Sequence, residues 1–160
     1  MDESVFVYDS MVRRVWAKRG SKPRVIVTGS HKKVFLSGAV ALDGTTLFRS
    51  YEGITSKEFI SYLNAVKRKY RKFVLFYDGA PWHTSDKVER FLKKNRRKIR
   101  PVMFPACSPE LNPVEECWNI GKEDNLGSTV PESFDKMRKG ISEYYRTKKF
   151  HLNIVRYLCP

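Results

Sequence analysis

Three acidic residues, Asp2, Asp78 and Glu115, stand where their carboxylates can act together. Asp2 begins the first apolar run of the chain, Asp78 directly follows the apolar run 73–77, and Glu115 lies at the start of a helical pattern. Carboxylates that are brought close together repel one another, and divalent cations relieve this repulsion. Oxygen-only ligands favour Mg²⁺ or Mn²⁺, and a pair of such ions can activate a nucleophile and stabilise the leaving oxygen of a phosphodiester. The three acids therefore predict a metal site for phosphodiester chemistry.

Two of these acids also have a purely structural interpretation. Asn112 and Pro113 suit the N-cap and first position of a helix, so Glu115 falls at the third position, where its carboxylate can bond back to the N–H of the cap. Asp78 precedes Gly79, and Asp-Gly is a common turn dipeptide. Each residue alone favours the structural interpretation, and the presence of a third acid favours the metal site.

The charge of the chain favours a polyanionic partner. The 31 Lys and Arg residues against 17 Asp and Glu residues give a formal net charge of +14, which indicates nucleic acid as the partner. Solvated Lys faces and anionic membrane surfaces are alternative explanations of the charge alone. The runs 67–72 and 93–100 offer phosphate contacts, although cations are also favoured at helix ends without any ligand. Charge and acids together predict an enzyme that acts on nucleic acid phosphodiesters.

The sequence lacks the marks of secretion and of membrane insertion. Nothing resembles a signal peptide, and the longest apolar runs are strand-sized, which predicts a soluble cytoplasmic protein without a membrane partner. Cys107, Cys117 and Cys159 are odd in number and form no C-x-x-C pair. They predict reduced thiols rather than a disulfide framework or a zinc cluster.

The elements that must position the acids follow one another in an α/β order. Strands are predicted at 3–8, 12–18, 24–27, 34–42, 45–51, 73–77 and 99–104, and helices at 55–70, at 85–95, from 112, and at 130–149 with Thr129 and Glu132 opening the last one. Asp43-Gly44 predicts a hairpin, and the continuous apolar run 73–77 predicts a central strand covered on both faces. A chain of 160 residues suits one domain. We expect one mixed central sheet with an N-terminal antiparallel hairpin and helices on both faces.

Five blocks of this sequence resemble successive blocks of the DDE-type transposase catalytic domain, in the insertion-sequence branch related to the mariner-like elements. They are MDES, VWAKRG, GAVALDGTTLFRSYEGITSKEFISYL, LFYDGAPWHTS and FPACSPELNPVEECW. The resemblance covers nearly everything from residue 2 to about residue 122. The most specific feature is the pairing of DGAPWH with SPELNPVE, whose acids have 36 residues between them.

The resemblance implies an RNase H-like fold and a transposase that cuts transposon ends and joins a DNA 3′-OH to target DNA. It implies two divalent ions, Mg²⁺ or Mn²⁺, and assigns Asp2, Asp78 and Glu115 as catalytic metal ligands. Transposon-end and target DNA, and a second copy of the chain in a homodimer, are the implied partners. A cytoplasmic, nucleoid-associated protein of a prokaryote is the corresponding expectation. Glu116 points about 100° away around the helix from its neighbour and is given no catalytic role.

Two further residues are candidate DNA contacts. His83 stands where the family block has a histidine, and it is assigned to a DNA phosphate or to proton transfer, with a structural role equally open. Lys122 follows Glu115 by seven residues on nearly the same helical face, where it can pair with a DNA phosphate or remain solvated. Trp118 is assigned to the core.

The sequence departs from the family pattern in two places. Gly79 stands where the family usually has Asn, which removes an amide that can orient the neighbouring carboxylate. No helix-turn-helix region precedes the catalytic blocks, so residues 1–160 are expected to form a single catalytic domain, either a fragment or the product of a truncated element. Because Asp2 lies next to the first residue, we expect this ligand to be loosely held. A decayed remnant that binds nucleic acid non-specifically and another RNase H-like nuclease are the alternatives.

Overall fold

The structure is a computed structural model that describes residues 1–9, 16–22, 24, 27–106, 108–126 and 131–157. Two predicted strands fall largely on the remaining residues: 12–15 and 25–26 lie outside the described residues, and the described parts of 12–18 and 24–27 form no strand. Of the three cysteines, only Cys117 is described, and it is a buried free thiol whose pKa burial raises to about 12. The prediction of a reduced thiol is confirmed for this residue.

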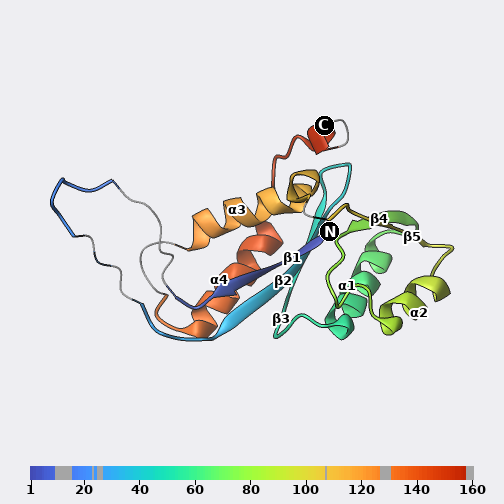
Figure 1. The fold of residues 1–160 in the computed structure, drawn as a ribbon, viewed down its shortest axis with the longest axis horizontal. Coiled ribbons are helices and arrows are strands. Elements are labelled where there is room, and N and C mark those ends of the chain that lie inside the picture. The colour runs from blue at the N-terminus through green and yellow to red at the C-terminus, as the bar shows by residue number, and fades with distance from the viewer. Residues whose placement is uncertain (10–15, 23, 25–26, 107, 127–130, 158–160) are drawn as a thin grey trace.

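The first part of the chain forms a three-stranded antiparallel sheet (Figure 1). Its strands are β1 (Asp2–Val7), β2 (Lys33–Val40) and β3 (Thr46–Tyr51), in the order β1-β2-β3. The predicted hairpin is confirmed: Gly44 adopts a φ of +78° in the turn between β2 and β3, a conformation that residues with a Cβ rarely adopt.

A second sheet consists of two parallel strands, β4 (Phe73–Tyr77) and β5 (Ile99–Met103). The helices α1 (Ser56–Lys69) and α2 (Asp86–Lys94) precede and follow β4, as predicted, and the Thr55 side chain caps α1. The nitrogen of Met1 donates a hydrogen bond to the carbonyl of Phe76 at 2.6 Å, so the start of β1 lies beside β4. The expected mixed sheet is thus present as two hydrogen-bonded parts that meet at this point.

The last part of the chain is helical. It contains the short 3₁₀ helix η1 (Pro109–Leu111), α3 (Pro113–Asn125), α4 (Phe134–Thr147) and the 3₁₀ helix η2 (Ile154–Tyr157). Asn112 caps α3, as predicted. The start of the last helix was predicted wrongly: Ser133 caps α4 by accepting a hydrogen bond from the N–H of Lys136, and Thr129 lies outside the described residues.

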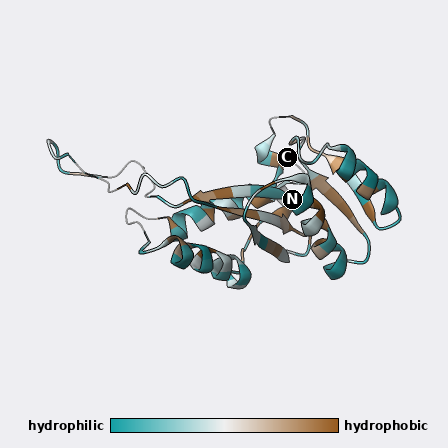
Figure 2. Ribbon diagram, turned by 90° about the horizontal axis from the view of Figure 1, so that it is seen from below, coloured by the Kyte–Doolittle hydropathy of each residue, from teal (hydrophilic) through white to brown (hydrophobic). Residues whose placement is uncertain are grey.

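Helices cover both faces of the β1-β2-β3 sheet, as expected. One hydrophobic cluster joins β1 and β2 to α3 and α4, and it includes Phe6, Leu36 and Trp118. The other cluster joins α1, α2, β4 and β5, and Leu47 of β3 packs against it. Figure 2 shows apolar residues gathered on the strands and polar residues along the outer sides of the helices. Within the described residues, no helix combines the length and the apolar character needed to cross a membrane.

One face of β4 is less covered than the apolar run suggested. Val74 and Phe76 are 49% and 44% exposed, whereas Leu75 and Tyr77 are buried. The prediction that both faces of this strand are covered is therefore wrong. The strand lies next to β5 and to the start of β1, and its inner face packs on α1 and α2.

Candidate active site

The three predicted acids lie on elements that meet where the two sheets join. Asp2 is the first residue of β1, Asp78 directly follows β4, and Glu115 lies in the first turn of α3. The hydrogen bond between Met1 and Phe76 holds the start of β1 beside the end of β4. The fold therefore brings together the elements that carry these acids from positions far apart in the sequence.

Asp2 is firmly held. Its backbone pairs with Gly38 in β2, its side chain is buried, and its Oδ2 accepts a hydrogen bond from Nε1 of Trp118 at 2.9 Å. Burial and, after it, the nearby charge of Glu115 raise the pKa of Asp2 to about 6, while the hydrogen bond from Trp118 opposes the shift. The expectation that this carboxylate is loosely held is wrong, because strand pairing and the indole both fix it.

Gly38 makes this arrangement of Asp2 and Trp118 possible. A Cβ on residue 38 would lie 2.5 Å from the ring of Phe48 and 2.7 Å from the ring of Trp118. The two rings already pack edge to face with centroids 5.2 Å apart. Only glycine leaves room for the indole to cross β2 and reach the carboxylate of β1.

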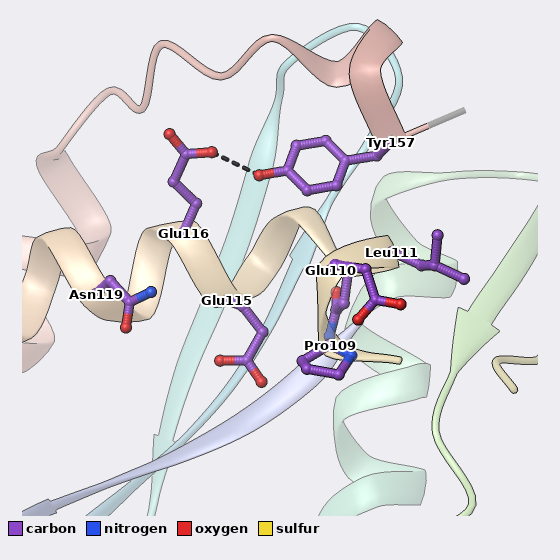
Figure 3. A pocket seen from close by; sticks show the side chains of 8 residues that line it. Pro109, Glu110, Leu111, Glu115, Glu116, Asn119 and Tyr157 are labelled. Carbon is purple, nitrogen blue, oxygen red and sulfur yellow. Dashed lines mark hydrogen bonds between the residues drawn. The ribbon is translucent and has the colours of Figure 1, made fainter. Parts of the chain in front are cut away.

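The structure separates the capping and metal-binding interpretations of Glu115. The side chain of Asn112 accepts a hydrogen bond from the N–H of Val114, and the N–H of Asn112 itself donates to the carbonyl of Pro109 at 3.0 Å. The N–H that a Glu115 cap would need is thus already bonded. Glu115 instead points to the side of α3 that faces β1, and its charge acts on Asp2 (Figure 3).

Glu116 points to the other side of α3, where its carboxylate accepts a hydrogen bond from the hydroxyl of Tyr157 at 2.5 Å (Figure 3). A groove of about 730 Å³ runs past both residues, and it is lined by Pro109, Glu110, Leu111, Asn112, Glu115, Glu116, Asn119 and Tyr157. The groove leaves Glu115 accessible to a ligand. The different directions of the two neighbouring acids agree with the prediction that only Glu115 faces the candidate site.

Asp78 is held by a histidine. Its Oδ1 accepts hydrogen bonds from Nδ1 of His83 at 2.7 Å and from the N–H of Ala80 at 3.2 Å. The bond from His83 is the main reason that the pKa of Asp78 is lowered from its ordinary value. The Asp78 carboxylate is therefore kept ionised and turned toward the imidazole on one side.

The burial of His83 favours the structural role over the DNA contact, the two roles that the sequence left open. Its side chain is fully buried, with the ring centroid 4.1 Å from that of Phe59. Burial by itself would lower the pKa of His83, but the hydrogen bonds to Asp78 and Glu3 outweigh it and raise the pKa to about 9. A ring enclosed in this way is well placed to orient the two carboxylates that it contacts.

Glu3 belongs to the site and was missed from the sequence. The Glu3 carboxylate lies 3.0 Å from Nε2 of His83 and accepts a 3.4 Å hydrogen bond from Nε1 of Trp82. Side chains alternate between the two faces of a strand, so Asp2 faces Trp118 while Glu3 faces the imidazole. The signal was present in the sequence as a second acid directly after Asp2.

The structure brings Asp2 and Glu115 close together and leaves Asp78 at the end of the neighbouring strand. Within the described residues, no three His, Cys, Asp or Glu side chains lie close enough to hold a metal ion, so the expected three-carboxylate cluster is not closed. Lys122 is partly buried on α3 and lies about 10 Å along the helix axis from Glu115.

The residues of the site nevertheless suit a hard divalent cation. Their donors are carboxylate oxygens, which Mg²⁺ and Mn²⁺ prefer. The raised pKa of Asp2 also reflects a buried negative charge beside the charge of Glu115, and a cation bound between the two would relieve the repulsion.

Comparison with known proteins gives the same fold and family. The model of the family described as DDE superfamily endonuclease matches residues 1–138. The chain is 36% identical over 109 residues to an insertion element IS630 uncharacterized 39 kDa protein of Shigella sonnei, with 64% of this chain and 31% of the relative covered. It is 34% identical over 70 residues to the transposable element Tc3 transposase of Caenorhabditis elegans, with 44% of this chain and 20% of the relative covered.

The chain thus spans about a third or less of the length of these two curated relatives. The Mos1 strand transfer complex superposes on 98% of this chain and 49% of its own chain with a TM-score of 0.71 at 15% identity. This likeness confirms the predicted RNase H-like α/β fold. The family match covers the elements that carry Asp2, Asp78 and Glu115, and the chain belongs to the DDE superfamily endonucleases.

Proposed function

We propose that this chain is the catalytic domain of a transposase that cleaves DNA strands at transposon ends and joins them to target DNA. The observation that carries the proposal is the convergence of the buried Asp2 and the groove-facing Glu115 within the region that matches the family model. Asp78, at the end of β4, supplies the third carboxylate. Residues 1–160 are proposed to act as one catalytic domain.

Asp2, Asp78 and Glu115 are the proposed ligands of two Mg²⁺ or Mn²⁺ ions. Bound there, the metal would supply Lewis-acid activation of the attacking and leaving oxygens of a phosphodiester. Mos1 paired-end complexes with Mn and with Mg, which share the fold, support this choice of metal. The contribution of the chain itself is orientation, because Trp118 holds Asp2 and His83 holds Asp78.

The proposed partners are the transposon ends, the target DNA and a second copy of the chain. The charge of +14 suits DNA, and exposed cations continue from α2 to β5: Lys87, Arg90, Lys93, Lys94, Arg96, Arg97, Lys98 and Arg100. Lys122, which lies on the same helix as Glu115, is the proposed phosphate contact nearest the site. The proposed place of action is the nucleoid of a prokaryotic cell.

The Asp78→Asn variant tests the proposed metal site. Mn²⁺ should raise the melting temperature of the wild-type chain, because a ligand that binds only the folded state stabilises it, and most of this gain should be absent in the variant. The Asp78→Asn variant should also lose the Mn²⁺-dependent nicking of plasmid DNA. Calorimetry with and without Mn²⁺ and a gel assay measure the two effects.

Glu123→Gln is the matched control for this test, because Glu123 is an exposed carboxylate on α3, and it should behave like the wild type. If Asp78→Asn keeps the full Mn²⁺-induced shift, the metal site is refuted. If wild-type chain binds duplex DNA but neither binds Mn²⁺ nor nicks it, the catalytically decayed remnant is the better interpretation.

Binding of this chain to DNA should depend steeply on salt and little on sequence. Phosphate contacts by Lys and Arg release counterions, so log K should fall linearly with log salt by about 0.9 per phosphate contacted. Lys122→Gln should weaken binding and reduce this slope by about one. Fluorescence anisotropy with two unrelated duplexes at several salt concentrations measures both effects, and Lys139→Gln on α4 is the charge-matched control. Salt-resistant binding to only one duplex would contradict the proposal.

A further inference from the structure

The imidazole of His83 lies between two carboxylates. Nδ1 is 2.7 Å from Oδ1 of Asp78 and 3.1 Å from the carbonyl of the same residue. On the other side of the ring, Nε2 lies 3.2 Å and 3.0 Å from the two carboxylate oxygens of Glu3. Ionised carboxylates and carbonyls only accept hydrogen bonds, so both ring nitrogens act as donors in this arrangement.

Asp78, His83 and Glu3 form a hydrogen-bonded network in this order, and the last two of its side chains are buried. The His83 side chain is 0% exposed and that of Glu3 is 4% exposed. The imidazole packs against Phe59 and lies edge-on to Tyr77 and Trp82, with centroids 5.7 Å and 5.8 Å away. Packing of this kind leaves a ring little freedom to rotate.

The Asp78 carboxylate, the first group of this network, is accessible to solvent. The Asp78 side chain is 53% exposed, and the residue that follows it is Gly79, which has no side chain to orient the carboxylate. An exposed Asp ordinarily samples several staggered rotamers. Here Oδ1 accepts hydrogen bonds from His83 and from the N–H of Ala80, an arrangement that leaves Oδ2 as the oxygen available to a ligand.

We propose that Glu3 and His83 are positioning residues, and that Glu3 acts through the imidazole to hold the Asp78 carboxylate in one orientation, ready for a divalent cation. This inference rests on the proposed function of Asp78 as a metal ligand. The buried side chains of Glu3 and His83 are rigidly held, and their hydrogen bonds restrict the exposed Asp78 carboxylate. An apolar pair would fill the same space without the cost of burying charges, so the contribution of Glu3 is orientation rather than packing.

The size of the effect follows from other metal sites. Loss of a group that orients a ligand typically weakens metal binding 10- to 100-fold. Because Glu3 acts through a second residue, Glu3→Leu should weaken Mn²⁺ binding about tenfold. Glu3→Gln should restore affinity to within about threefold of wild type, because its amide oxygen still accepts the hydrogen bond from Nε2.

The experiment measures the dissociation constant of Mn²⁺ by electron paramagnetic resonance on purified, folded chains. The double variant Glu3→Leu/His83→Phe removes both polar groups at once, so neither is left buried without the other, and only the half-buried Nε1 of Trp82 loses a long hydrogen bond. It therefore guards against simple unfolding of the single variant. It should fold, as judged by circular dichroism, and bind Mn²⁺ at least about tenfold more weakly. Glu89→Leu, an exposed site on α2, is the control and should match the wild type. Wild-type affinity in the folded double variant would overturn the proposal.

A second readout needs no metal. Side-chain NMR couplings of Asp78 in the metal-free chain should report one rotamer in wild type and in Glu3→Gln, and rotamer averaging in the double variant. Unchanged couplings in the double variant would overturn the proposal. If wild-type chain binds no Mn²⁺, the proposed function fails, and these couplings alone then decide whether Glu3 positions Asp78.

Discussion

Glu115→Gln is expected to abolish Mn²⁺-dependent DNA cleavage while leaving the stability of the chain nearly unchanged. The helix start does not depend on this carboxylate, because Asn112 caps α3 and donates its own N–H to Pro109. The substitution removes one negative charge from the side that faces Asp2. Activity should fall at least about a hundredfold, which corresponds to about 3 kcal/mol of transition-state stabilisation, and the melting temperature should change by less than about 2 °C.

Glu116→Gln is the matched control for this variant. It removes the neighbouring charge, whose partner is Tyr157 on the opposite side of the helix, and it should keep most of the activity. A gel assay for strand cleavage and a thermal melt on both variants separate the two roles. If Glu115→Gln unfolds the chain, or if it cleaves as fast as wild type, the capping interpretation is restored.

Asp2→Asn is expected to stabilise the metal-free chain at pH 7.5 and to remove the stabilisation by Mn²⁺. The folded chain raises the pKa of Asp2 from 3.8 to about 6, mainly by burial. The folded state therefore binds this proton more tightly than the unfolded state, so the resulting stability is present below pH 3.8 and is lost as the pH rises through 6. Above pH 6 the ionised carboxylate therefore lowers the free energy of unfolding by about 3 kcal/mol.

Asparagine carries no charge and can still accept the hydrogen bond from Trp118. The melting temperature of Asp2→Asn should exceed that of wild type by several degrees at pH 7.5, at about 2 to 4 °C per kcal/mol, and the difference should nearly vanish at pH 4. Melts at both pH values, with and without Mn²⁺, measure this, and Glu123→Gln on the exposed side of α3 is the control. A variant less stable than wild type at pH 7.5 would show that the carboxylate is not under strain.

Local signals in the sequence predicted the elements well. Gly44 marks the hairpin because its turn needs a positive φ, and Thr55 and Asn112 mark helix starts because their side chains accept backbone N–H groups. These signals depend on neighbours in the chain. The run 73–77 predicted a strand, but its covering depends on distant elements, and one face is half exposed.

The site was predictable only as a set of residues. The three acids and their family positions could be read from the sequence, whereas their surroundings depend on contacts between distant segments: Glu3 meets His83 across 80 positions, and Asp2 meets Trp118 across 116. No local pattern encodes such distances. The burial of His83, which favours its structural role, depends on β1 lying beside the end of β4, and no local pattern predicts that contact.

The contact between Trp118 and Asp2 lets α3 fix the distance between two carboxylates of the site. Glu115 and Trp118 are three residues apart on one helix, a rise of about 4.5 Å, and Trp118 grips the carboxylate of β1 directly. The spacing between the carboxylates of Asp2 and Glu115 is therefore set by one rigid helix and one hydrogen bond. As long as this hydrogen bond is kept, β1 and α3 move together. The distance between the two carboxylates then stays the same when other parts of the domain move.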